Sequence, residues 1–329
     1  MSDLLASISR PLQPLRRVFG ASEIGILFIL ILLIVLVSFF QPNFASIASL
    51  SNFGSRAAWF GIIGLGVVFQ LSMGEIDLST ASIYGLTINV AAIVVVAFGV
   101  DPWVAAALGI AVGIALGALN AIMATAFKVP VIIITLGTLS AFKGLTLIVS
   151  GGGFIYGLPR DHSFFKVMGA APLGVPMVIW VFALLTAGLS VVYNHTRYGF
   201  MVRSIGSNPR AAELSGIPVA RVKMLTLMLT GALCGISGML TLAFFSTADP
   251  NLGTGYELLA ITAAIIGGTA LTGGRGTVIG AALGALLIAV ISSGIVQFGI
   301  TANWSVFVTG VLIIFAVALD AAIRRRRIR

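Results

Sequence analysis

Side chains that bind metals, form disulfides or act as nucleophiles are scarce in this sequence, and their scarcity excludes several kinds of protein. Cys234 is the single cysteine, so no intramolecular disulfide can form. The chain has two histidines, His162 and His195, which the topology predicted below places on opposite sides of a membrane. A histidine metal site is therefore not expected. No combination of nucleophile and base, or of metal ligands, indicates a membrane enzyme.

A nucleotide-binding loop is also missing. The stretch Gly267-Gly-Thr-Ala-Leu-Thr-Gly-Gly-Arg-Gly276 superficially resembles a phosphate loop. It lacks the Gly-Lys-Ser/Thr ending that places a lysine on the phosphates, and no ATPase motif occurs elsewhere in the chain. We therefore predict that the chain is not an enzyme and binds no cofactor. Any ATP and Mg that drive it must be used by partner subunits.

Charged residues make up only 9% of the chain, whereas 59% of the residues are hydrophobic and the mean hydropathy is +1.12. These values are typical of a polytopic membrane protein and not of a soluble domain. Taking about 20 apolar residues for each span, we predict an all-α bundle of about ten transmembrane helices in a single domain over 1–329. The predicted spans are 24–40, 57–73, 79–98, 103–127, 130–149, 174–193, 224–245, 258–272, 277–297 and 302–320.

The net charge of +9 does not indicate nucleic-acid binding, because the basic residues lie between apolar segments and at the chain ends. An even number of spans puts both termini on one side, and 15 of the 19 Lys and Arg residues then lie on that side. The positive-inside rule makes this side cytoplasmic. The two ends of the chain, an N-terminal segment (1–23) and a basic tail (321–329), are then cytoplasmic. Two longer loops lie between spans: an outward loop (150–173), with a short helix over Phe164–Met168, and a cytoplasmic loop (194–223).

The cytoplasmic loop 194–223 contains a very short helix with start and stop signals at both ends. Asn208 suits the N-cap position, and Pro209 fits the first helical position, where its missing N–H is not needed. Gly216 suits the left-handed residue after the helix, and Pro218 prevents its continuation. Such a helix is too short to be stable alone in water. It is interpreted either as a docking site for another protein or as an ordinary cytoplasmic loop with a helical turn.

Two acidic residues follow breaks in the apolar pattern. Gly74-Glu-Ile-Asp-Leu-Ser79 places Asp77 between two apolar runs, and Glu257 follows a second glycine-containing break. A charge inside a span costs free energy in hydrocarbon and usually lines a cavity, so one interpretation is a broken helix whose backbone lines a path. The other is a short loop in contact with the cytoplasm.

Similar glycine motifs follow the two acids, at Gly113–Leu119 and Gly280–Leu286. They indicate either duplicated halves or close helix packing. Neutral polar residues in or beside the spans form hydrogen bonds either with a solute or between helices, and both interpretations stay open. These residues are Gln70, Ser79, Asn89, Asn120 and Thr135.

Four segments together resemble a known family. Gly74–Ser79, Ile205-Gly-Ser-Asn-Pro-Arg-Ala-Ala-Glu-Leu-Ser-Gly-Ile217, Gly253-Thr-Gly-Tyr-Glu-Leu-Leu-Ala-Ile261 and the glycines of 267–276 are similar to the ribose-type permeases of bacterial ABC importers. These belong to the branched-chain amino acid/ribose permease superfamily. The match runs in order over nearly the whole chain. The family usually has Gly where this chain has Glu75, which leaves the identity of the solute open.

The resemblance implies a type II ABC importer-like fold in the bacterial inner membrane, surrounded by lipid. It implies a permease that pairs with a second copy or a paralogue and takes a monosaccharide or related polyol from a periplasmic sugar-binding protein. ABC ATPase subunits would drive it through a coupling helix. The residues assigned to that contact are Asn208, Pro209, Arg210, Ala211, Ala212, Glu213 and Gly216. The residues assigned to the translocation path are Asp77, Ser79, Asn89, Asn120, Thr135 and Glu257.

A function of a different class is also open, namely a self-sufficient secondary transporter or channel that uses Asp77 and Glu257 as proton or cation sites. The small number of charges inside spans and the elaborate cytoplasmic loop argue against it. Uptake by the purified chain alone would favour this alternative, whereas a requirement for separate ATPase subunits would favour the importer.

Overall fold

The protein is a bundle of helices in the computed structural model, which describes residues 21–301, 303, 304, 307, 308, 310, 311, 314 and 318. In this part of the chain eight helices are long and apolar enough to cross a membrane. This confirms the predicted class of all-helical polytopic membrane protein. The eight helices are α3 (Ala21–Phe40), α4 (Ile47–Ser72), α5 (Thr80–Phe98), α6 (Pro102–Phe127), α7 (Val131–Ser150), α9 (Met177–His195), α12 (Val219–Phe245) and α14 (Val278–Gln297).

Six shorter elements connect these helices. Four are α-helices and two are single 3₁₀ turns. They are η1 (Pro42–Ala45), α8 (Ser163–Met168), η2 (Pro172–Gly174), α10 (Arg197–Ser207), α11 (Pro209–Leu214) and α13 (Tyr256–Ile266).

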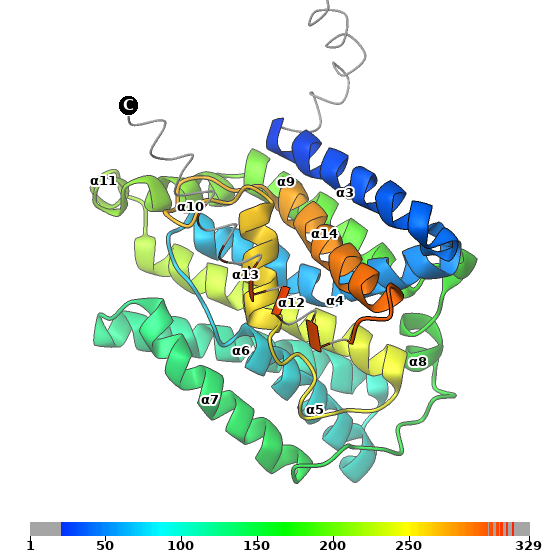
Figure 1. The fold of residues 1–329 in the computed structure, drawn as a ribbon. Helices are drawn as coiled ribbons and strands as arrows, with labels where there is room; N and C mark the ends of the chain where they lie inside the picture. The colour runs from blue at the N-terminus through cyan, green and yellow to red at the C-terminus, as the bar shows by residue number, and fades with distance from the viewer. Residues whose placement is uncertain are drawn as a thin grey trace, which may run out of the picture.

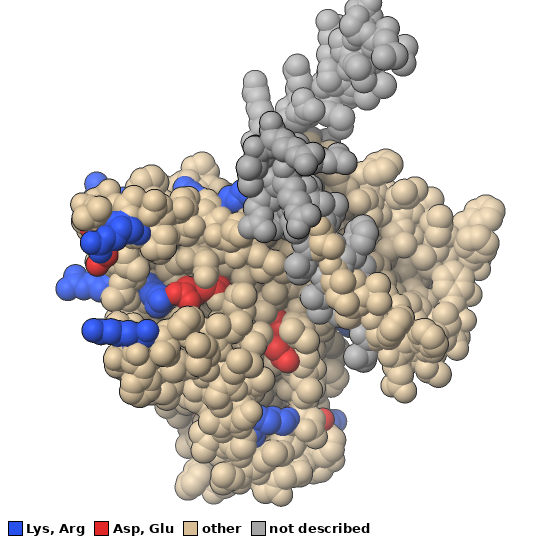
Figure 2. Space-filling model, turned by 60° about the vertical axis from the view of Figure 1, so that its left-hand side comes forward, with Lys and Arg blue, Asp and Glu red and all other residues tan. Residues whose placement is uncertain are grey.

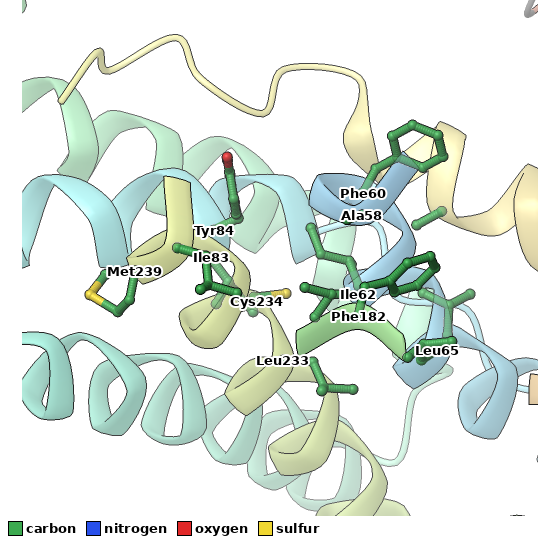
Figure 3. Packing of buried hydrophobic residues seen from close by; sticks show 14 of the residues in the cluster. Ala58, Phe60, Ile62, Leu65, Ile83, Tyr84, Phe182, Leu233, Cys234 and Met239 are labelled. Atoms are coloured by element: carbon green, nitrogen blue, oxygen red, sulfur yellow. The ribbon is translucent and has the colours of Figure 1, made fainter. Parts of the chain in front are cut away.

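Helix α4 lies at the centre of the bundle, and 89% of the residues in its most apolar 18-residue stretch are buried. It packs against α9, α12, α13 and α14 (Figure 1). Figure 3 shows part of this core, in which Phe60, Ile62 and Leu65 of α4 lie near Phe182 of α9. By contrast, less than a third of the residues in the most apolar 18-residue stretches of α3, α7 and α9 are buried. These outer helices expose apolar side chains, as is expected of helices that face lipid.

Glycine allows α6 and α12 to approach each other closely. A Cβ atom on Gly113 or Gly117 would collide with the backbone carbonyls of Gly231 and Leu227 in α12. In lipid, helices have little hydrophobic attraction for each other, so small residues that permit backbone contact favour their association. Gly284 of the second motif contacts the backbone of Ala263 in the same way. Both glycine motifs therefore serve close packing.

Two predicted spans differ from the structure, and a third is not tested by it. α4 begins at residue 47 rather than 57, because Ser46 caps its N-terminus and its first turns are too polar for a hydropathy window to include. The predicted span 258–272 is the 11-residue helix α13, which is about 16 Å long at 1.5 Å per residue and too short to cross a membrane. Most of the predicted span 302–320 lies outside the described residues, so the count of ten is not reached in the described part.

The connections lie at two ends of the bundle. At one end, which we call the α11 end, the backbone N–H of Gly274 donates to the carbonyl of Ser72. At the opposite end, an isolated β-bridge between Ile155 and Ala248 joins two connections. The predicted short helix over Phe164–Met168 is confirmed as α8. The predicted tail 321–329 and nearly all of the N-terminal segment 1–23 lie outside the described residues.

Candidate functional site

Helix α11 lies at the edge of the molecule (Figure 1), and the residues that predicted it occupy the expected capping positions. The side-chain oxygen of Asn208 accepts a hydrogen bond from the backbone N–H of Ala211 at 3.0 Å, and Pro209 occupies the first helical position. Gly216 follows the helix with a φ of +81°, which an L-residue with a side chain rarely adopts. The predicted capped helix is confirmed.

One side of α11 faces the protein and the other faces away. Ala212 is buried, with 4% of its surface exposed, whereas Leu214 is 77% exposed. Arg210 and Glu213 are also exposed and form an ion pair at 3.2 Å. An exposed leucine beside a pair of opposite charges is a surface that suits contact with another protein. Figure 2 shows Lys and Arg side chains gathered toward the side on which α11 lies.

The preceding helix α10 packs tightly on the end of α4. A Cβ atom on Gly206 would collide with the carbonyl of Ser72 and with the backbone of Gly274, so only glycine fits between them. Tyr198 of α10 stacks on Phe69 with ring centroids 5.8 Å apart. Burial raises the pKa of Tyr198 to about 12, so its hydroxyl stays protonated at neutral pH. Gly274 of the glycine-rich stretch 267–276 therefore joins α10 to the end of α4.

The connection 73–79 between α4 and α5, which we call the break, is organised around Asp77. Asp77 Oδ1 accepts hydrogen bonds from the backbone N–H and the hydroxyl of Ser79 at 2.8 and 2.6 Å. Its Oδ2 accepts from Gln70 Nε2 at 3.4 Å. Asn120 Nδ2 donates to Ser79 Oγ at 2.8 Å, and the backbone N–H of Leu78 donates to Thr135 Oγ1 at 3.2 Å. The structure thus brings together four of the residues assigned to the path.

All four of these residues are buried, and both carboxylate oxygens of Asp77 have partners. The other two assigned residues lie outside this network. Asn89 is buried within α5 and donates to the carbonyl of Gly85 at 2.8 Å. Glu257 lies in the first turn of α13, where the helix dipole favours a carboxylate, and it lines a cavity.

Glu75 connects the break to two further helices. Its carboxylate forms an ion pair with Lys223, near the start of α12, and its Oε2 accepts from the backbone N–H of Val131 at 3.4 Å. Val131 is the first residue of α7, whose N-cap residue, Pro130, provides no side-chain cap. A carboxylate is favoured at this position by the helix dipole. Glu75 therefore binds the break, α7 and α12 together.

Comparison with known proteins supports the family that the sequence motifs indicate. A family model described as "Branched-chain amino acid transport system / permease component" matches residues 49–317. The chain belongs to this family of permease components. The permease is 33% identical to the ribose import permease protein RbsC of Escherichia coli (strain K12) over 293 residues, which is 88% of this chain and 91% of the relative.

Two further relatives are similar over comparable lengths. The permease is 35% identical to the ribose import permease protein RbsC of Bacillus subtilis (strain 168) over 291 residues, which cover 88% of this chain and 90% of that protein. It is 33% identical over 304 residues to the D-allose transport system permease protein AlsC of E. coli (strain K12), with 92% of both chains covered. The comparison with solved structures found no significant match.

Sequence reasoning missed the ionic contacts of the permease. Glu75 and Lys223 are far apart in the sequence, and Lys223 was counted only as one of the cytoplasmic charges. Lys143 lies within α7, where its Nζ donates to the carbonyl of Pro250 at 2.6 Å. A lysine inside an apolar run of transmembrane length was the signal that would have identified it.

Replacing Asp77 by alanine should lower solute uptake by the permease strongly, whereas asparagine should largely preserve it. Alanine would leave the donors of Ser79 and Gln70 buried without partners, at a cost of about 1–3 kcal/mol each. The carbonyl oxygen of an asparagine at position 77 still accepts from Ser79. Its NH₂ group can donate to Oε1 of Gln70, which has no partner now, once the Gln70 amide has rotated. Uptake into vesicles measures the effect. Equal loss in both variants would show that the charge itself is needed, as an ion site requires.

Proposed function

We propose that this permease forms the solute path of an ATP-driven bacterial importer for a monosaccharide or a related polyol. The observation that carries the proposal is the capped helix α11, one side of which points away from the protein, together with its connections to the transmembrane helices. The relatives named above support the class of solute, because their names specify ribose import and D-allose transport. The permease itself binds no cofactor; ATP and Mg are used by its partners.

The partners follow from this role. ABC ATPase subunits bind α11 on the cytoplasmic side, and a periplasmic sugar-binding protein delivers the solute at the opposite end. A second permease copy or a paralogue completes the path, and lipid surrounds the outer helices. The basic residues of the connections at the α11 end support a cytoplasmic location for this end, with both termini on that side of the inner membrane. They are Lys128, Arg197, Arg203, Arg210, Arg221, Lys223 and Arg275.

Two contacts transmit the movement of α11 to the break. The helix before α11 reaches Ser72 through Gly206, and the helix after it reaches Glu75 through Lys223. Ser72 and Glu75 lie immediately before and within the break, so a displacement of α11 moves the break from both sides. Rigid displacement of packed elements between two arrangements is a common basis of switching. We infer that the break acts as the cytoplasmic gate.

The path runs from the cavity beside Glu257 toward the break in this proposal. Asn89 lies farther along α5 than the cavity-lining Ser82 and Gly85, on the side away from the break. Asp77, Ser79, Asn120 and Thr135 form the wall of the gate. The hydrogen bonds that join Asp77, Ser79 and Asn120, together with the one from the backbone N–H of Leu78 to Thr135, support a closed gate in the present arrangement. Opening would expose hydroxyl and amide groups that can bind solute hydroxyls in turn.

Reconstituted vesicles test the proposal. Vesicles with the permease, its ATPase subunits, the binding protein and ATP should accumulate labelled ribose, D-allose or L-arabinose. Vesicles with the permease alone should not, with or without an ion gradient, because the chain has no energy source of its own. The matched control is the complete system with a non-hydrolysable ATP analogue. Accumulation by the permease alone would instead support the secondary transporter that uses Asp77 and Glu257.

A further inference from the structure

A cavity of about 220 Å³ lies between α5, α7 and the connection that leads into α13. It holds the volume of roughly seven water molecules at about 30 Å³ each, which is below the usual range for drug-sized ligands. Its polar lining comes from three parts of the chain. The polar side chains are Ser82, Ser140, Lys143, Thr146, Thr254 and Glu257. The size and lining indicate a small polar solute.

The two charged side chains of the cavity differ in how far they are satisfied. Lys143 Nζ donates to the carbonyl of Pro250 at 2.6 Å and to Asn251 Oδ1 at 3.1 Å, which uses two of its three donors. Glu257 Oε2 is buried and has no hydrogen-bond partner among the described residues. The two residues form no ion pair with each other in the described part of the chain.

A buried carboxylate oxygen without a partner is costly, so a bound donor would stabilise it. The terminal torsion of a glutamate has a broad minimum, so a small rotation of the carboxylate can bring Oε2 toward a donor in the cavity. A hydroxyl group supplies such a donor. It also supplies an acceptor for the remaining N–H of Lys143.

We propose that this cavity binds one neutral polyol of monosaccharide size, with Glu257 accepting from its hydroxyls and Lys143 donating to them. The proposal rests on the importer function above and names a binding site within it. One positive and one negative side chain cancel in the lining, so a cation gains little there. A zwitterion would place its ammonium on Glu257 and its carboxylate on Lys143, so an amino acid is the alternative ligand that the test below distinguishes from a polyol.

Protection of an engineered cysteine tests the site directly. Ser140 is exposed and lines the cavity, whereas Ser150 lies on the same helix and does not. Each is changed to cysteine in a chain with Cys234→Ala, and the complete complex in nanodiscs is treated with a water-soluble thiol reagent. Ribose, D-allose or L-arabinose at about four times its dissociation constant should slow reaction at Ser140→Cys about fivefold. Reaction at Ser150→Cys should not change.

Glu257→Gln supplies the second arm. The amide keeps the size of the side chain and loses the charge, so protection of the cysteine at position 140 should need about tenfold more sugar. Asp161→Asn, an exposed carboxylate outside the cavity, is the matched control and should leave protection unchanged. Protection by leucine and not by any sugar would overturn the polyol assignment.

The outcomes separate the site from the function. If the complete complex imports a sugar but neither cysteine is protected, the cavity proposal is overturned and the importer stands. If the cysteine at position 140 does not react even without sugar, water does not enter the cavity, and the proposal is overturned too. Failure of the complete complex to import any of the sugars contradicts the proposed function instead.

Discussion

Replacing Asn208 by leucine or Gly216 by valine should lower ATP-driven uptake at least about tenfold while the chain still inserts into the membrane. Leucine removes the cap of α11, which is worth about 1 kcal/mol. Valine is strained at a φ of +81°, because a β-branched side chain does not tolerate the left-handed conformation. A six-residue helix has no stability of its own to offset either loss. The surface that we propose as the contact with the ATPase is then disordered.

Conservative variants at the same positions separate loss of the helix from loss of a particular side chain. Asn208→Ser keeps an N-cap, and Gly216→Asn keeps a residue that tolerates the left-handed conformation. Both should retain most of the uptake. Ser215→Ala, which removes an exposed hydroxyl bonded to the carbonyl of Ala211, is the neighbouring control. Co-purification of the ATPase subunits measures docking separately. Normal uptake by the leucine and valine variants would show that α11 does not couple the two proteins.

Helix α11 was predictable from sequence because its determinants are local. An N-cap, a proline and a glycine within nine residues mark where the helix begins and ends. The class of fold was predictable for a related reason, since a membrane span depends on the length and hydropathy of one segment. The same reasoning failed for α13. A hydropathy window averages an apolar helix with the glycine-rich turn that follows it, and so extends the helix into that turn.

The site was less predictable because its determinants are contacts between distant segments. The sequence indicated that Asp77 lies in a break, but not that Gln70 and Ser79 satisfy both of its oxygens. Nor did it distinguish Asp77 from Glu257, which has an oxygen without a partner among the described residues. The hydrogen-bonding of a buried acid depends on which helices surround it, and this follows only from the packing.

The contact between Glu75 and Lys223 should have the second large effect. The two side chains are about one-fifth exposed, at 18% and 20%, so the pair is more valuable than a surface pair, which contributes about 1 kcal/mol or less. Lys223→Glu places two carboxylates in contact and removes the link between α12 and the break. We expect uptake to fall at least about tenfold. ATP hydrolysis by the partners should continue, because α11 is intact and the ATPase still docks.

Reversing both charges tests whether the pair itself transmits movement. Glu75→Lys with Lys223→Glu restores the ion pair and should recover part of the uptake that each single variant loses. Recovery should be incomplete, because a lysine at position 75 faces the N-terminus of α7, where the helix dipole disfavours a cation. Arg221→Glu, an exposed change two residues from Lys223, is the matched control and should leave uptake nearly unchanged. The decisive quantity is the number of solute molecules moved per ATP hydrolysed. If this ratio stays normal in Lys223→Glu, the movement of α11 reaches the gate without Glu75, and the junction of Gly206 with Ser72 must transmit it alone.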